Sequence, residues 1–335
     1  MIRRLAMLLL VLSGVLPVAL QAAQAAQARD FPVSATPFTS DIYPDRVSRF
    51  PGGVTGLADV VYSVIPGFRP LVVDLYMPPG TEARPLVIYI HGGGWVGGHT
   101  RHSGALSDFP KVLARLASEG FVVASLEYRL SGEAPFPAAL QDARAALRFL
   151  RANAAKYHID PARVGVWGGS AGGHLTALLA TSCGDASLDP APVAGVAAPS
   201  PGSECVQAAV TWYGVFDFAP MVARQGNGSE VKFLGCNGPC DAKAVARASP
   251  VTYIGKGDPP FLLIHGERDA TVDVSQSRLA EARLRAAGVP VTAIYIPDVD
   301  HSFIGAKPQV TRDATLKATN ATFDFFHQVL DRARK

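Results

Sequence analysis

This chain has few cysteines, no sequence repeats and little excess of either charge sign. Its 335 residues include four cysteines, and 31 Lys and Arg oppose 28 Asp and Glu, a formal net charge of +3. The chain therefore has no basic excess that would attract nucleic acid or an anionic membrane. We find no internal repeat. Beyond the N-terminus, no segment is long and apolar enough to cross a bilayer, so we expect no stable membrane insertion.

The longest apolar run lies at the N-terminus. Two arginines, an almost wholly apolar stretch over 5–20 and an alanine-rich stretch at A-x-A spacing follow one another. This layout is typical of a secretory signal peptide over 1–28, cleaved near 25–28. A membrane anchor is the alternative, but the run is short for a span and contains a glycine and a proline. We therefore expect a secreted protein, periplasmic or extracellular.

The four cysteines are predicted to form two disulfides, as exported proteins commonly do. Cys236 and Cys240 flank an Asn-Gly-Pro turn, which favours a local bridge between them. Cys183 then pairs with Cys205. Four free thiols are the alternative. A zinc site is disfavoured, because no histidine lies at ligand spacing from these cysteines.

Strand-like and helix-like segments alternate along most of the chain. Strands are expected at 60–65, 71–76, 85–90, 121–126, 163–167, 206–212, 261–264 and 291–296. Helices are expected at 107–118, 138–154, 171–181, 275–287 and 315–334. A turn between the first two strands predicts an antiparallel pair. The later alternation predicts an α/β fold, with a mostly parallel sheet of about eight strands and helices on both faces.

Three stretches lack this rhythm. Residues 29–56 are predicted to be irregular, and one α/β domain is expected over 57–335. Residues 184–204 and 215–250 are the least regular parts of that domain. In parallel sheets function gathers at the carboxyl ends of the strands, so we expect these two stretches to form loops over a cleft there.

A G-x-S-x-G motif centred on Ser170 directly follows the strand expected at 163–167 and opens the next helix. In this context of strand, sharp turn and helix, the motif marks an exposed nucleophilic serine. Gly168 and Gly172 lack the side chains that would clash in such a turn. The alternative is a glycine-rich connection with an incidental serine.

A second glycine motif, His-Gly-Gly-Gly-Trp at 91–95, follows the strand expected at 85–90. Acyl transfer develops negative charge on a carbonyl oxygen, which backbone N–H groups can stabilise if they point at it. Consecutive glycines let the backbone approach that closely. The N–H of Ala171, the residue after the serine, is a further expected donor. A phosphate-binding loop is disfavoured, because no Lys-Ser/Thr pair follows the glycines.

A hydroxyl nucleophile needs a base, usually a histidine held by an acid. Of eight histidines, position favours His301, just past the last expected strand. Asp269 is predicted to be the acid, in the loop after the strand at 261–264, with Glu267 and Asp273 as its nearest rivals. The order Ser, Asp, His is the one found with G-x-S-x-G nucleophiles.

Together these motifs resemble those of α/β-hydrolase esterases. The chain is most similar to the bacterial feruloyl/acetyl-xylan esterase-like group, a relative of hormone-sensitive-lipase-type esterases, from about residue 60 onward. The motifs that carry the resemblance are 91–95, 168–175, H-G-x-x-D-x-x-V from His265 and His-Ser-Phe from His301.

The resemblance implies the α/β-hydrolase fold and a secreted carboxylic-ester hydrolase. It assigns catalysis to Ser170, His301 and Asp269. It assigns the oxyanion N–H groups to Gly93, Gly94 and Ala171. This acyl-enzyme chemistry needs no metal or organic cofactor.

Four aromatic residues bear on the nature of the substrate. Trp95, Trp212, Tyr213 and Phe303 are predicted near the strand ends, where they would line the pocket or pack the core. Export and the resemblance favour feruloyl or acetyl esters of plant polysaccharide. A general short-chain carboxylesterase is the alternative. A serine peptidase and a non-catalytic binding protein are further alternatives, and the oligomeric state is not indicated.

Overall fold

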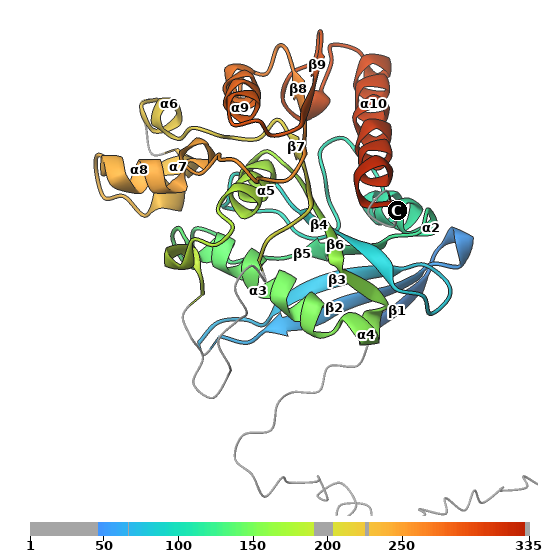
Figure 1. Ribbon diagram of the computed structural model, residues 1–335. Helices are drawn as coiled ribbons and strands as arrows, with labels where there is room; N and C mark the ends of the chain where they lie inside the picture. Colours follow the sequence, from blue (N-terminus) through green and yellow to red (C-terminus); the bar gives the residue numbers. More distant parts are fainter. Residues whose placement is uncertain (1–45, 66, 191–203, 225–227, 332–335) are drawn as a thin grey trace, which may run out of the picture. The chain divides into compact units, whose positions relative to one another are not determined.

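The computed structural model describes residues 46–65, 67–190, 204–224 and 228–331 (Figure 1). The predicted signal peptide lies outside these residues, as does most of the segment that was expected to be irregular. Within the described ranges, no helix is both long enough and apolar enough to span a membrane.

Nine strands of the described chain form one sheet, in the order β1-β2-β3-β5-β4-β6-β7-β8-β9. They are β1 (Arg46–Arg49), β2 (Thr55–Ser63), β3 (Leu71–Met77), β4 (Arg84–Ile90), β5 (Val122–Leu126), β6 (Ile159–Gly169), β7 (Ala208–Trp212), β8 (Phe261–Gly266) and β9 (Val291–Ile296). The pairs β1–β2, β2–β3 and β3–β5 are antiparallel. From β5 across to β9 every pair is parallel. The predicted mostly parallel sheet, with an antiparallel pair at its start, is confirmed.

Strand β1 is one departure from the prediction. It lies in the segment 29–56, which was expected to be irregular. Its four residues, Arg-Val-Ser-Arg, are all exposed at the edge of the sheet. Because neither face of β1 is buried, its sequence carries no apolar alternation that could have revealed it.

The helices are α2 (Phe109–Ser118), α3 (Ala138–Ala152), α4 (Ala154–Tyr157), α5 (Ala171–Thr181), α6 (Ala219–Val222), α7 (Ser229–Leu234), α8 (Ala242–Ala248), α9 (Ser275–Ala286) and α10 (Pro308–Phe326). Short 3-10 turns are η1 (Pro51–Gly53), η2 (Ala186–Leu188), η3 (Pro250–Thr252) and η4 (His301–Phe303), and a π-helical turn, η5 (His327–Asp331), follows α10. The last helix begins at Pro308 rather than at residue 315. Proline is compatible with that first helical position, because the N–H it lacks has no partner there.

Two apolar cores lie on opposite faces of the sheet. Alternate residues of β4 divide between them: Leu86, Ile88 and Ile90 pack with α3, α5 and α9, whereas Val87 and Tyr89 pack with α2 and α10. Both faces of the central strands are therefore buried, as expected for parallel strands covered by helices. The positions of α3 and α10 in Figure 1 show these two layers.

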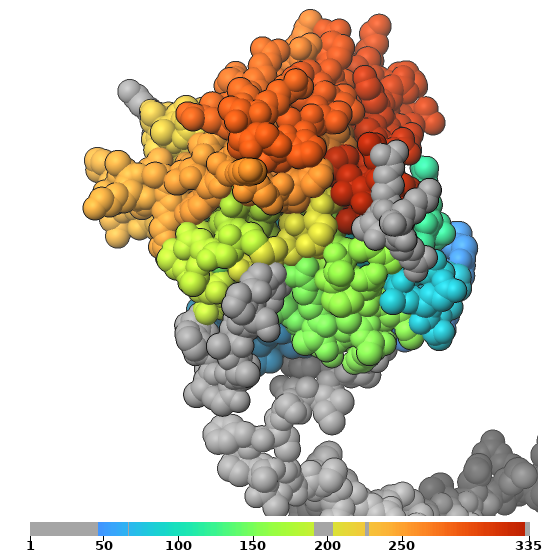
Figure 2. All heavy atoms as spheres, viewed as in Figure 1, coloured from blue at the N-terminus to red at the C-terminus, as the bar shows by residue number. Residues whose placement is uncertain are grey.

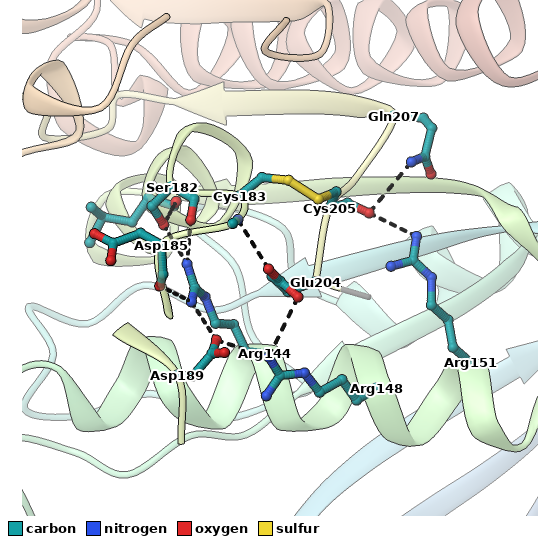
Figure 3. Close-up of a disulfide and its surroundings, with 12 residues drawn as sticks. Arg144, Arg148, Arg151, Ser182, Cys183, Asp185, Asp189, Glu204, Cys205 and Gln207 are labelled. Carbon is teal, nitrogen blue, oxygen red and sulfur yellow. Dashed lines mark hydrogen bonds and ion pairs between the residues drawn. A yellow bond between two sulfur atoms is a disulfide. The ribbon is translucent and has the colours of Figure 1, made fainter. Parts of the chain in front are cut away.

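The disulfide between Cys183 and Cys205 joins the end of α5 to the approach to β7. Next to it, Figure 3 shows the guanidinium of Arg144, which comes from α3 and is fully buried. Its Nη1 atom lies 2.6 Å from an Asp189 carboxylate oxygen, and its Nη2 atom donates to the carbonyl of Ser182. This ion pair and the disulfide tie α3, α5 and the following loop together.

The segment 215–250 is more regular than expected, because it holds α6, α7 and α8 instead of loops alone. A disulfide between Cys236 and Cys240 closes the turn from α7 to α8. In Figures 1 and 2 these helices, coloured yellow to light orange, protrude to the left of the sheet. Residues of α6 and α7 line part of the cavity described next.

Candidate active site

Ser170 lies at a sharp turn between β6 and α5. Its backbone has φ 55° and ψ −123°, a conformation with positive φ that side-chain-bearing residues rarely adopt. A Cβ at Gly172 would meet the carbonyl oxygens of Ile90 and His91, and one at Gly168 would meet the carbonyl of Gly172. Because the chain after β4 runs this close to the turn, only glycine fits at both positions. This close approach explains the G-x-S-x-G pattern.

Three side chains from three connections form one hydrogen-bonded series. The Oγ atom of Ser170 lies 2.9 Å from Nε2 of His301, which follows β9. The Nδ1 atom of His301 lies 2.8 Å from Oδ2 of Asp269, which follows β8. In this series the hydroxyl donates to Nε2 and the Nδ1–H group donates to the carboxylate. A neutral imidazole in this tautomer can accept the hydroxyl proton.

Asp269 is held as an anion. Its side chain is fully buried, and its Oδ1 atom accepts the backbone N–H groups of Thr271 and Val272 at 2.9 and 2.8 Å. Burial alone raises the pKa of this carboxyl group, but hydrogen bonds from His265 and His301 outweigh it and bring the pKa well below its usual value. The carboxylate is thus ionised at neutral pH.

The rival acids are engaged elsewhere. Asp273 accepts the backbone N–H of Ser275 at 2.9 Å, at the start of α9. Glu267 is exposed and pairs with Arg278 at 3.3 Å. Among the described contacts, neither acid touches His301, so of the three acids considered from the sequence only Asp269 does.

The glycine motif follows β4 on the other side of Ser170. Gly93 and Gly94 have positive φ values of 114° and 59°, and both line the same cavity as Ser170. The Gly93 carbonyl accepts the N–H groups of Val96 and Gly97 at 3.1 Å, which closes a tight turn. Ala171 is the first residue of α5, so its N–H has no acceptor within the helix. These three residues are the ones expected to supply the oxyanion donors.

The cavity has a volume of about 540 Å³. Of the four aromatic residues expected near the substrate, Trp95 and Tyr213 line it. The Tyr213 ring also meets the His301 ring edge-on, with centroids 4.7 Å apart. Burial raises the pKa of Tyr213 well above its usual value, so its phenol stays protonated.

The expectation that Trp212 and Phe303 line the pocket is wrong. Each is 1% exposed and lies outside the cavity wall. Trp212 points into the face of the sheet covered by α10, where its Nε1–H donates to Oγ1 of Thr322 at 3.0 Å. Phe303 packs edge-on against Trp212, with ring centroids 5.3 Å apart. These aromatic side chains build the core under the site.

Several cavity residues were not foreseen from the sequence. Met221, Ser229 and Glu230 come from α6 and α7, and His102 and Ser103 come from the loop that follows the glycine motif. No motif marks these residues, and only the expectation that 215–250 covers a cleft pointed toward the first three. Among described residues, no group of three or more His, Cys, Asp or Glu could hold a metal ion.

Comparison with known proteins places this chain in a family. The BD-FAE family model matches residues 73–284. Esterase LipQ of Mycobacterium tuberculosis is 32% identical over 73% of this chain, and Esterase LipC of the same organism is 32% identical over 67%. The chain spans 57% of the length of LipQ and 54% of that of LipC.

Solved structures show the same fold. A truncated carbohydrate esterase from gut microbiota is 27% identical, with a TM-score of 0.66 over 82% of this chain and 96% of that one. A bifunctional GH43-CE protein of Bacteroides eggerthii is 30% identical, with a TM-score of 0.68 over 82% of this chain and 38% of that one. Thermogutta terrifontis esterase 2, 23% identical with a TM-score of 0.64 over 80% of this chain and 93% of that one, shares the fold. The chain has the α/β-hydrolase fold and belongs to the BD-FAE family.

Proposed function

We propose that this protein is a carboxylic-ester hydrolase that forms an acyl-enzyme on Ser170. The observation that carries the proposal is the hydrogen-bonded series from Ser170 through His301 to Asp269. The opening of Gly93 and Gly94 into the same cavity adds support. So do the relatives, several of which are named esterases or carboxylesterases.

In the proposed mechanism, Ser170 attacks the ester carbonyl while His301 takes its proton. The ionised carboxylate of Asp269 stabilises the imidazolium that forms. The N–H groups of Gly93, Gly94 and Ala171 stabilise the tetrahedral oxyanion, and loss of one such donor typically costs about 100-fold or more in rate. His301 then protonates the leaving alcohol, and water, activated by the same imidazole, hydrolyses the acyl-enzyme.

For the substrate we propose feruloyl or acetyl esters of plant polysaccharide. Membership of the BD-FAE family and the likeness to a carbohydrate esterase from gut microbiota support this class. A general short-chain carboxylesterase is the second candidate, favoured by the name Carboxylesterase NlhH of a relative that is 38% identical over 37% of this chain. Secretion is part of the proposal, and the two disulfides support it because such bonds persist in oxidising compartments.

Labelling with a fluorophosphonate probe tests the chemistry. Wild type should be labelled, and Ser170→Ala should not. If the folded wild type is not labelled, the chain is not a serine hydrolase and a binding function replaces the proposal.

A substrate panel separates the two ester classes. Hydrolysis of p-nitrophenyl acetate, methyl ferulate and acetylated xylan would be compared on the mature chain. Activity on the last two supports the polysaccharide proposal. Activity on p-nitrophenyl acetate alone supports a general carboxylesterase, and cleavage of peptides without esters would indicate a peptidase.

A further inference from the structure

Glu230 is an acidic residue in the wall of the active-site cavity. It is the second residue of α7, is half-buried, and lines the same cavity as Ser170. Its neighbour Ser229 lies against the glycine motif, since a Cβ built on Gly94 would be 3.3 Å from the Ser229 side chain. The start of α7 therefore lies beside the expected oxyanion site, and Glu230, as its second residue, lies close to that site.

Among the residues that the structure describes, no basic side chain in the cavity wall offsets this carboxylate. The described titratable residues that line the cavity with Glu230 are His102, His301 and two buried tyrosines, and they include neither lysine nor arginine. Within the described chain, Glu230 has no hydrogen-bonded or ion-paired partner. The nearby Arg224 donates to the carbonyl of Thr271 at 2.7 Å and lies outside the wall.

We propose that Glu230 determines charge specificity: the cavity rejects esters with a negative charge near the scissile bond and accepts neutral or cationic ones. The inference rests on the proposed ester hydrolysis and names its substrate class more narrowly. A carboxylate repels an anion and attracts a cation, and a cleft with low-dielectric walls screens this interaction less than open solvent does. Unpaired like charge is one way in which a site discriminates against the wrong ligand.

Paired substrates of similar shape isolate the charge. On the acyl side, 4-nitrophenyl hemisuccinate is compared with neutral 4-nitrophenyl valerate. On the alcohol side, cationic butyrylthiocholine is compared with its neutral carbon analogue, S-(3,3-dimethylbutyl) thiobutyrate. For each variant, the kcat/KM of one substrate is divided by that of its partner. This ratio does not depend on the enzyme concentration or on the overall activity of the variant.

Three variants complete the design. Glu230→Gln removes the charge, and Glu230→Lys reverses it. Glu82→Gln is the matched control, because Glu82 is exposed just before β4, at the amino-terminal end of that strand, whereas Ser170 follows the carboxyl end of the parallel strand β6. It changes the net charge of the protein equally without changing the cavity.

Wild type should favour valerate over hemisuccinate and thiocholine over its carbon analogue. Glu230→Gln should shrink both preferences by about tenfold, the effect of one unit charge several ångströms away in a partly screened cleft. Glu230→Lys should reverse them, and Glu82→Gln should leave them unchanged. High salt should weaken the wild-type preferences. Equal pair ratios in wild type and Glu230→Gln would overturn the inference.

Binding separates this inference from the proposed reaction. The same pairs are titrated calorimetrically into Ser170→Ala, with and without Glu230→Gln. A charge preference that disappears with Glu230→Gln supports the inference even if no ester is hydrolysed. Hydrolysis by wild type combined with charge-independent binding refutes the inference and leaves the reaction standing.

Discussion

Two aspartates in the loop after β8, Asp269 and Asp273, have different roles although they are only four residues apart. Asp269 and Asp273 both follow β8 and both accept backbone N–H groups, yet only Asp269 reaches the imidazole of His301. The N–H groups of Thr271 and Val272 hold one carboxylate oxygen and leave the other for the histidine. The loop conformation, rather than residue type, distinguishes the two acids.

Replacing Asp269 by asparagine should lower kcat on p-nitrophenyl acetate by about 10⁴-fold, because an amide favours the wrong tautomer of the histidine. Asp273→Asn is the matched control and should change kcat by less than about threefold, since its loss affects only the start of α9. Steady-state kinetics on both folded variants measure the difference. Equal losses would mean that Asp269 does not orient His301.

The imidazole of His174 joins three elements around the site. Trp95, at the end of the glycine motif, donates its Nε1–H to Nδ1 of His174 at 3.2 Å. His174 lies in α5, one turn after the serine, and its Nε2–H donates to the carbonyl of Ala248 at 2.7 Å. The glycine motif, the helix after Ser170 and the end of α8 are thereby held in register.

Replacing Trp95 by phenylalanine should therefore lower the free energy of unfolding by more than the loss of ring volume accounts for, because Nδ1 of His174 is left buried without its donor. Trp167→Phe is the control: Trp167 is equally buried, but its Nε1 has no hydrogen-bond partner among the described residues. We expect Trp95→Phe to lower the free energy of unfolding by about 1–2 kcal/mol more than Trp167→Phe. Urea unfolding measures both, and equal costs would show that the Trp95–His174 bond adds nothing.

The two disulfides should differ in their effect on stability. Cys183 and Cys205 are 22 residues apart, whereas Cys236 and Cys240 are 4 apart. Loop-closure entropy predicts that the first bond contributes about 3 kcal/mol and the second about 2 kcal/mol. Double serine variants of each pair, unfolded in urea, measure these values. A larger loss of stability in the Cys236/Cys240→Ser double variant would show that this bond acts mainly by holding α7 to α8 in the folded protein, rather than by restricting the unfolded chain.

For the whole molecule, buried histidines couple stability to pH. Burial lowers the pKa of His91 to about 4 and that of His174 to about 3, despite hydrogen bonds to backbone carbonyls that oppose the shift. The unfolded chain therefore takes up these protons first, near pH 6.5. Their stabilising effect is complete above that pH and is lost as pH falls toward the folded values. His327 acts in the opposite sense, because its carboxylate partners raise its pKa although burial lowers it.

Lowering the pH from 8 to 5 should destabilise the fold by about 2 kcal/mol for each of His91 and His174, or about 4 kcal/mol together. Urea unfolding across this range measures the slope. His174→Gln should reduce the drop by about half, whatever it does to the absolute stability. A drop of the same size in wild type and in His174→Gln would contradict the prediction.

The fold class and the glycine-rich turns were predictable from the sequence alone. Strand and helix patterns extend over many residues, so a mostly parallel sheet was predictable even though the exposed strand β1 was not. At Gly168 and Gly172, neighbouring backbone atoms lie so close that they leave no room for a Cβ. Such constraints leave a local sequence pattern, and Ser170 could be located from it.

Which side chains meet around Ser170 could not be predicted from the sequence and depends on the tertiary packing. Of the two tryptophans expected at the cavity, Trp95 lines it and Trp212 packs under α10. Glu230 lies in that wall without any motif to mark it. These outcomes depend on how segments distant in the chain pack together, and such packing leaves no periodic or spaced pattern for the sequence to display.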